Sequence, residues 1–100
     1  MSHRIRLRGF WTATSLEDGR TRWVRKFGQP RSLDPAESAW LTADRLPSSA
    51  TVYLNGQLIG TVTESGFTIE VTGKLLPRNE VCLELSGEVE ELFLDVHSQS

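Results

Sequence analysis

The tightest constraint on how this chain folds is an Asn-Gly pair, Asn55-Gly56, set between two short apolar runs. The stretch from Ala50 to Gly60 reads ATVYLNGQLIG. Asn and Gly tolerate the positive φ angles that a type I′ turn requires, and the twist of that turn matches the twist of the two strands that it joins. The stretch therefore predicts a β-hairpin in the middle of the chain.

Short runs with period-two or β-branched character continue on both sides of this hairpin. We expect eight strands, at His3–Thr12, Arg20–Phe27, Ser38–Asp44, Thr51–Leu54, Gln57–Thr63, Phe67–Val71, Glu80–Leu85 and Glu90–His97. Clusters of Gly, Pro, Asn and Ser separate these runs, and no amphipathic helix of useful length competes with them. Frequent short strands with such breaks indicate an all-β, antiparallel sandwich or barrel.

The length and composition predict one soluble domain. One hundred residues, 38% of them hydrophobic, are enough for a single domain over residues 1–100 whose core needs neither disulfides nor metals. Cys82 is the sole cysteine, which excludes an intrachain disulfide and a cysteine-based zinc site. The N-terminus lacks the apolar core of a signal peptide, and no apolar run approaches the ~18 residues that span a membrane. We expect a cytoplasmic protein without a membrane contact or a cofactor.

Charge is divided unevenly along the chain, although the net charge is only −2. Residues 1–31 carry eight basic and two acidic residues, whereas the rest of the chain carries three basic and eleven acidic ones. Such asymmetry can indicate a surface for nucleic acid or another anionic ligand. Here Arg4, Arg6 and Arg8 alternate with apolar residues, as on the solvent face of a strand. We therefore expect cross-strand ion pairs, each worth at most ~1 kcal/mol, rather than a nucleic-acid partner.

The residue types that carry catalysis occur without the partners that catalysis needs. Glycoside hydrolysis requires two carboxylates about 5 to 10 Å apart, but the adjacent Glu90 and Glu91 point to opposite faces of a strand. His3 and His97 have no suitably spaced Asp, Glu or Cys that would complete a metal site or a triad. Acidic neighbours disfavour the thiolate of Cys82. We expect no catalytic residue, no metal ligand and no enzyme activity.

Five segments between Arg20 and Leu85 carry a recognisable pattern. They are Trp23–Phe27 followed by Pro30, Ala39–Ala43, Ala50–Gly56 with Gly60, Phe67–Thr72 and Asn79–Leu85. In this order they resemble the N-terminal sugar-binding domain of family-two glycoside hydrolases. The resemblance implies an eight-stranded, antiparallel jelly-roll sandwich of the galactose-binding-domain-like superfamily. In that family the catalytic glutamates lie in a separate barrel domain, so the resemblance implies a non-catalytic module with carbohydrate as its ligand.

The turns of such a sandwich alternate between its two ends. One end gathers the turns at 14–19, 47–49, 64–66 and 87–88, and the other gathers those at 29–37, 55–56 and 74–79. The second end has the longest loop and the more varied hydrogen-bonding side chains, so we predict the ligand there. The candidate ligand-binding residues are Gln29, Arg31, Trp40, Asn55, Gln57, Arg78 and Asn79. Asn55 also has a purely structural interpretation, as part of the turn.

The aromatic residues leave a second function open. A tryptophan in a small sandwich usually lies in the core or covers it, with its indole N–H satisfied at the edge, and we expect this of Trp11, Trp23 and Trp40. A large aromatic patch on an outer sheet face would instead indicate a protein interface. The residues that could form one are Phe10 or Trp11, Tyr53 and Phe93. The alternative function is therefore a protein interaction or homo-oligomerisation domain with no small ligand.

Overall fold

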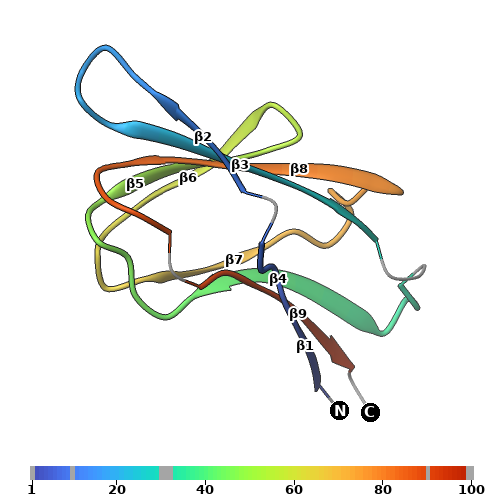
Figure 1. Ribbon diagram of the computed structural model, residues 1–100. Coiled ribbons are helices and arrows are strands. Elements are labelled where there is room, and N and C mark those ends of the chain that lie inside the picture. The colour runs from blue at the N-terminus through green and yellow to red at the C-terminus, as the bar shows by residue number, and fades with distance from the viewer. Residues whose placement is uncertain (1, 10, 30–32, 90, 99–100) are drawn as a thin grey trace.

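Two antiparallel sheets pack face to face as a sandwich (Figure 1). The computed structural model describes residues 2–9, 11–29, 33–89 and 91–98. The four-stranded sheet has the order β1 (Ser2–Arg6), β9 (Phe93–Ser98), β4 (Glu37–Ala43), β7 (Phe67–Glu70). The five-stranded sheet has the order β2 (Thr12–Ser15), β3 (Thr21–Gly28), β8 (Arg78–Leu85), β5 (Ala50–Leu54), β6 (Gln57–Val62). The predicted all-β, antiparallel fold class is confirmed. Within the described residues we find no helix that is long and apolar enough to cross a membrane.

The strand count differs from the expected eight, because nine strands are present among the described residues. The run predicted as one strand, His3–Thr12, is divided between the two sheets: β1 pairs with β9, and β2 pairs with β3. Between them Gly9 adopts a positive φ of 63°, which an extended strand cannot include. Period-two alternation continues through this break, which is why the pattern alone joined the two strands.

The hairpin predicted at Asn55-Gly56 forms between β5 and β6. Asn55 has φ 52° and Gly56 has φ 82°, the two positive angles of a type I′ turn. The ladder shifts register between Val52 and Tyr53, next to Gly60. A Cβ at Gly60 would lie 2.8 Å from Cδ1 of Ile69, so the missing side chain lets β6 approach β7 where the two sheets meet at one edge.

The core lies between the sheets and follows the alternation of the strands. Val81, Leu83 and Leu85 point inward from β8, and Leu41 and Leu94 face them from the four-stranded sheet, all at most 1% exposed. Burial of each such side chain contributes roughly 1.5 to 3 kcal/mol. The even-numbered residues of β8 therefore lie on the outer side of the five-stranded sheet.

Cross-strand ion pairs join the basic N-terminal part of the chain to its acidic remainder, as expected. Arg4 Nε lies 2.8 Å from Asp95 Oδ1, and Arg22 Nη2 lies 2.6 Å from Glu84 Oε2. Each pair sits on directly opposed residues of neighbouring strands, β1 with β9 and β3 with β8. The charge asymmetry of the sequence is therefore used in part to hold strand register.

The aromatic residues do not gather into an open patch within the described part of the chain. Trp11 Nε1 donates to the Leu7 carbonyl (3.1 Å), Trp23 Nε1 donates to the Gly87 carbonyl (3.0 Å), and both rings pack partly against the core. Phe93 is only 4% exposed, because Arg4 Cζ lies 4.2 Å from its ring centroid. Tyr53 is half-buried, and Phe10 lies outside the described residues. Phe93 therefore does not form the exposed surface that the protein-interface hypothesis required of it.

Candidate functional site

The turns gather at the two ends of the sandwich as predicted. At one end the Ser86 N–H donates to Ser48 Oγ (2.9 Å), and the Leu46 N–H donates to the Glu64 carbonyl (3.0 Å). At the other end the Gln29 N–H donates to the Pro77 carbonyl (3.1 Å). The second end, where we predicted the ligand, contains an open cleft.

This cleft has a volume of about 600 Å³ and lies where β3 ends and β8 begins. We call it the β3–β8 cleft. Its lining residues are Lys26, Phe27, Gly28, Asn55, Pro77, Arg78, Asn79 and Glu80. The size is within the range of about 300 to 1,000 Å³ that is usual for small-molecule sites.

Asn79 holds the base of the cleft in place. The residue is 3% exposed, and its side chain accepts from the Leu76 N–H (2.8 Å) while donating to the Leu76 carbonyl (2.8 Å). The same Oδ1 also accepts from Asn55 Nδ2 (3.1 Å). The loop before β8 is thereby tied to the β5–β6 turn, which gives the cleft a fixed shape.

Asn55 completes this network. Its Oδ1 accepts from the Glu80 N–H (2.8 Å), and its own N–H donates to the Glu80 carbonyl (2.8 Å). The amide groups of Asn55 and Asn79 are thus engaged with one another and with the backbone. Within the described residues, Asn55 and Asn79 therefore shape the cleft. The charged side chains that line it remain able to contact a ligand.

The other candidates fall in different places. Gln57 lines an adjoining hollow of about 320 Å³ that shares Asn55 with the cleft. Gln29 is half-buried beside Gly28, and Arg31 lies outside the described residues. The structure therefore brings Asn55, Arg78 and Asn79 together in one cleft and places Gln57 next to it.

Trp40 does not belong to this end, contrary to our expectation. Its neighbours Ala39 and Leu41 are fully buried in the core, so alternation along β4 directs the indole to the outer side of the four-stranded sheet. There its Nε1 donates to Ser38 Oγ (2.9 Å). We placed Trp40 at this end because of its position along the strand, but the direction of its side chain depends on which face of the sheet it occupies.

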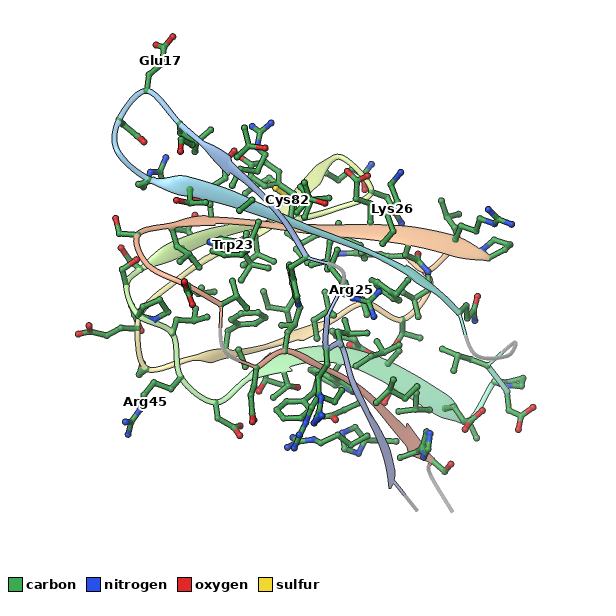
Figure 2. All side chains as sticks on the ribbon, viewed as in Figure 1. Glu17, Trp23, Arg25, Lys26, Arg45 and Cys82 are labelled. Atoms are coloured by element: carbon green, nitrogen blue, oxygen red, sulfur yellow. The ribbon has the colours of Figure 1, made fainter. Side chains whose placement is uncertain are left out.

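Two residues that the sequence analysis missed, Lys26 and Glu80, also line the cleft. They are directly opposed in the β3–β8 ladder. The cleft therefore extends from the loop end onto the outer face of the five-stranded sheet. Figure 2 shows Lys26 and Cys82 on this outer side, whereas Trp23 and Arg25 point toward the other sheet. The alternation within β3 indicates that Lys26 faces outward. That Glu80 lies opposite it can be known only from the register of two strands that are far apart in the chain.

A smaller hollow of about 300 Å³ continues along the same outer face and shares Glu80 with the cleft. It is lined by Arg22, Val24, Tyr53, Gly56, Glu80 and Cys82. Burial, more than any nearby charge, raises the pKa of the Cys82 thiol, so this sulfur stays protonated near neutral pH and is a poor nucleophile.

The described lining of the cleft offers charged and hydrogen-bonding groups. Over the described ranges, no three His, Cys, Asp or Glu side chains come together as ligands of a metal ion. Of the described residues that line the cleft, Glu80 is the one carboxylate. Lys26, Arg78 and Glu80 supply charged hydrogen-bonding groups around an opening whose base is fixed.

Comparison with known proteins shows that this fold is similar to part of a carbohydrate enzyme. No protein-family model and no curated protein matches the sequence. The structure is similar to part of the crystal structure of FMN-binding beta-glucuronidase from Facaelibacterium prausnitzii L2-6, with a TM-score of 0.83 and 16% sequence identity. The match covers 98% of this chain and 23% of that chain. At this identity the likeness establishes the fold: an antiparallel β-sandwich of the kind present in a glycoside hydrolase.

Proposed function

We propose that this protein is a non-catalytic carbohydrate-binding module and that saccharide binds in the β3–β8 cleft. The observation that carries the proposal is the cleft itself: a rigidly framed, open hollow rimmed by Lys26, Arg78 and Glu80. A fold shared with part of a glucuronidase supports carbohydrate as the ligand class.

The cleft suits a saccharide for three physical reasons. Sugar hydroxyls both donate and accept hydrogen bonds, and the cleft offers donors on Lys26 and Arg78 and an acceptor on Glu80. The ring of Pro77 gives an apolar surface for the C–H face of a sugar. Because the Asn55–Asn79 network already fixes the base, binding loses little free energy to ordering the protein.

The proposal assigns no hydrolytic step to the cleft. A glycosidase places two carboxyl groups on opposite sides of the scissile bond, and the described lining residues give Glu80 no second carboxylate beside it. Any hydrolysis of the bound saccharide would therefore use catalytic groups from elsewhere, with this sandwich holding the substrate.

Gly28 allows a sharp test of the location. It lines the cleft, and a Cβ added there would meet only the Pro77 carbonyl, at an ordinary 3.6 Å. Gly28→Trp should fill the cleft without disturbing the core, whereas Gly28→Ala should leave it open. A glycan array probed with the wild-type protein and both variants should show binding by the wild type and Gly28→Ala and none by Gly28→Trp. No glycan signal for the wild type, or equal signals for Gly28→Trp, would refute the proposal.

One observation favours the alternative of a protein partner. Strand β6 lies at the edge of its sheet, where unpaired backbone groups can pair with another chain, and its Leu58 is 61% exposed. Light scattering on the wild type and on Leu58→Ser distinguishes the two functions. A dimer that Leu58→Ser dissociates, together with no binding to glycans, would favour the interaction domain.

A further inference from the structure

We propose that the saccharide held in the β3–β8 cleft is an acidic one, bound through its anionic group by Lys26 and Arg78; this rests on the function proposed above. The chain as a whole has a net charge of −2. Among the described residues, the lining of the cleft nevertheless contains two cations and one acid, Glu80. The local charge is thus opposite in sign to that of the whole protein.

Neither cation forms a salt bridge within the described residues. The three salt bridges there are Arg4–Asp95, Arg20–Asp18 and Arg22–Glu84. Lys26 and Arg78 take part in none of them, and both side chains are exposed. Their charges are therefore available to a ligand.

Two pairs of oppositely charged residues in the β3–β8 ladder can be compared directly. Arg22 opposes Glu84 and Lys26 opposes Glu80, with both pairs on the outer face of the same two strands. The first pair closes to 2.6 Å, whereas the second forms no salt bridge. A cross-strand ion pair thus forms at one position and stays open at the other, and the open one borders the cleft.

A third cation extends the positive region. Lys74 lines the adjoining hollow, which shares Asn55 with the cleft. Lys74 also takes part in none of the salt bridges of the described residues. Three cations against one carboxylate among the described residues of two adjacent hollows raise the local concentration of an anion.

The geometry of the groups favours a carboxylate or a phosphate on the sugar. The guanidinium of Arg78 can donate two parallel hydrogen bonds to either group, while the Lys26 ammonium acts as a point charge. A sugar acid and a sugar phosphate share this chemistry, and binding experiments with both compounds separate them.

The test measures binding of D-glucuronate, glucose 6-phosphate and glucose to the full chain by NMR titration. We expect at least one of the two anionic sugars to bind about tenfold more tightly than glucose. Lys26→Gln and Arg78→Gln should each reduce that preference, and raising the salt from ~20 to ~300 mM should weaken it. Glu80→Gln should increase affinity for the anionic sugar, because it removes the one repulsive charge.

Arg45→Gln is the matched control. It also removes one exposed positive charge, but from the loop after β4 at the far end of the sandwich from Lys26 (Figure 2). It should leave every affinity unchanged. Equal affinities for glucose and both anionic sugars would overturn this inference and leave the proposed function intact, whereas no binding by any sugar would refute both.

Discussion

The Asn55 side chain donates to the Asn79 side chain across 3.1 Å and so joins the β5–β6 turn to the start of β8. Asn55 belongs to the turn that is most evident in the sequence, and Asn79 is its buried partner 24 residues later. Together they connect the local geometry of a hairpin to the shape of the β3–β8 cleft.

Asn79→Ala should destabilise the protein by about 2 to 4 kcal/mol. The change leaves the N–H and carbonyl of Leu76 and the Nδ2 donor of Asn55 without the Asn79 side chain as their partner. Urea unfolding followed by tryptophan fluorescence measures the loss. Gln57→Ala, an exposed change at the neighbouring hollow, is the control and should stay within ~0.5 kcal/mol of the wild type. Equal effects of the two variants would contradict the role given to Asn79.

Two glycines with positive φ should differ sharply in their tolerance of a methyl group. At Gly66 a Cβ would lie 2.2 Å from the Ala43 carbonyl oxygen and 2.7 Å from that of Asp44, whereas at Gly19 it would meet open space. Gly19→Ala then suffers only the backbone strain, roughly 1 to 2 kcal/mol. Gly66→Ala must also displace backbone, so we expect its loss in the free energy of unfolding to exceed that of Gly19→Ala by at least ~2 kcal/mol. Similar midpoints of denaturation for the two variants would show that the turn before β7 is less tightly packed than described.

The Arg4–Asp95 pair should make stability depend on acid pH. The hydrogen bond from Arg4 is the largest cause that lowers the pKa of the Asp95 carboxyl below its ordinary value. A carboxyl whose pKa is lower in the folded state stabilises the protein above the pKa of the unfolded state, about 4. That contribution is lost as the pH falls below this value and passes through the folded-state pKa.

The measurement compares thermal unfolding of the wild type and Asp95→Asn between about pH 6 and pH 2.5. The difference in Tm between them should shrink as the pH falls. Glu17→Gln changes an exposed carboxylate that takes part in no salt bridge of the described residues, and it should follow the wild type throughout. A constant difference between Asp95→Asn and the wild type would contradict the expected linkage.

Cys82 should react slowly with thiol reagents at neutral pH. Burial raises the pKa of its thiol, and the thiolate is the reactive form. Reaction with Ellman's reagent at pH 7 should be slower than that of free cysteine and should accelerate above about pH 9. A rate equal to that of free cysteine at pH 7 would mean that the sulfur is more accessible, or its pKa lower, than the fold implies.

Much of the fold follows from local patterns in the sequence. Period-two alternation located the buried residues of β8, and the Asn55-Gly56 pair located the β5–β6 turn, because both signals arise from a few neighbouring residues. The boundary between β1 and β2 was missed because alternation continues past Gly9, whose positive φ depends on the chain passing from one sheet to the other.

The candidate site was less predictable because it depends on which strands lie side by side. The loop end could be identified from alternating strand directions, and it contains Asn55, Arg78 and Asn79. Lys26 joins them only because β3 pairs with β8, and that register is set by packing of the whole sandwich. The position of Trp40 could have been predicted, because its apolar neighbours Ala39 and Leu41 already indicate which face of β4 is buried.

A residue-by-residue map of saccharide binding decides whether the β3–β8 cleft is a carbohydrate site. Backbone amide shifts of the ¹⁵N-labelled chain would be recorded during titration with lactose, as a neutral probe, and with D-glucuronate. We expect saturable shifts that centre on Gly28, Arg78 and Glu80 and are absent from Gly28→Trp. No shift with either probe, or shifts confined to the exposed edge of β6 or to the Trp40 face of the four-stranded sheet, would contradict binding in the cleft.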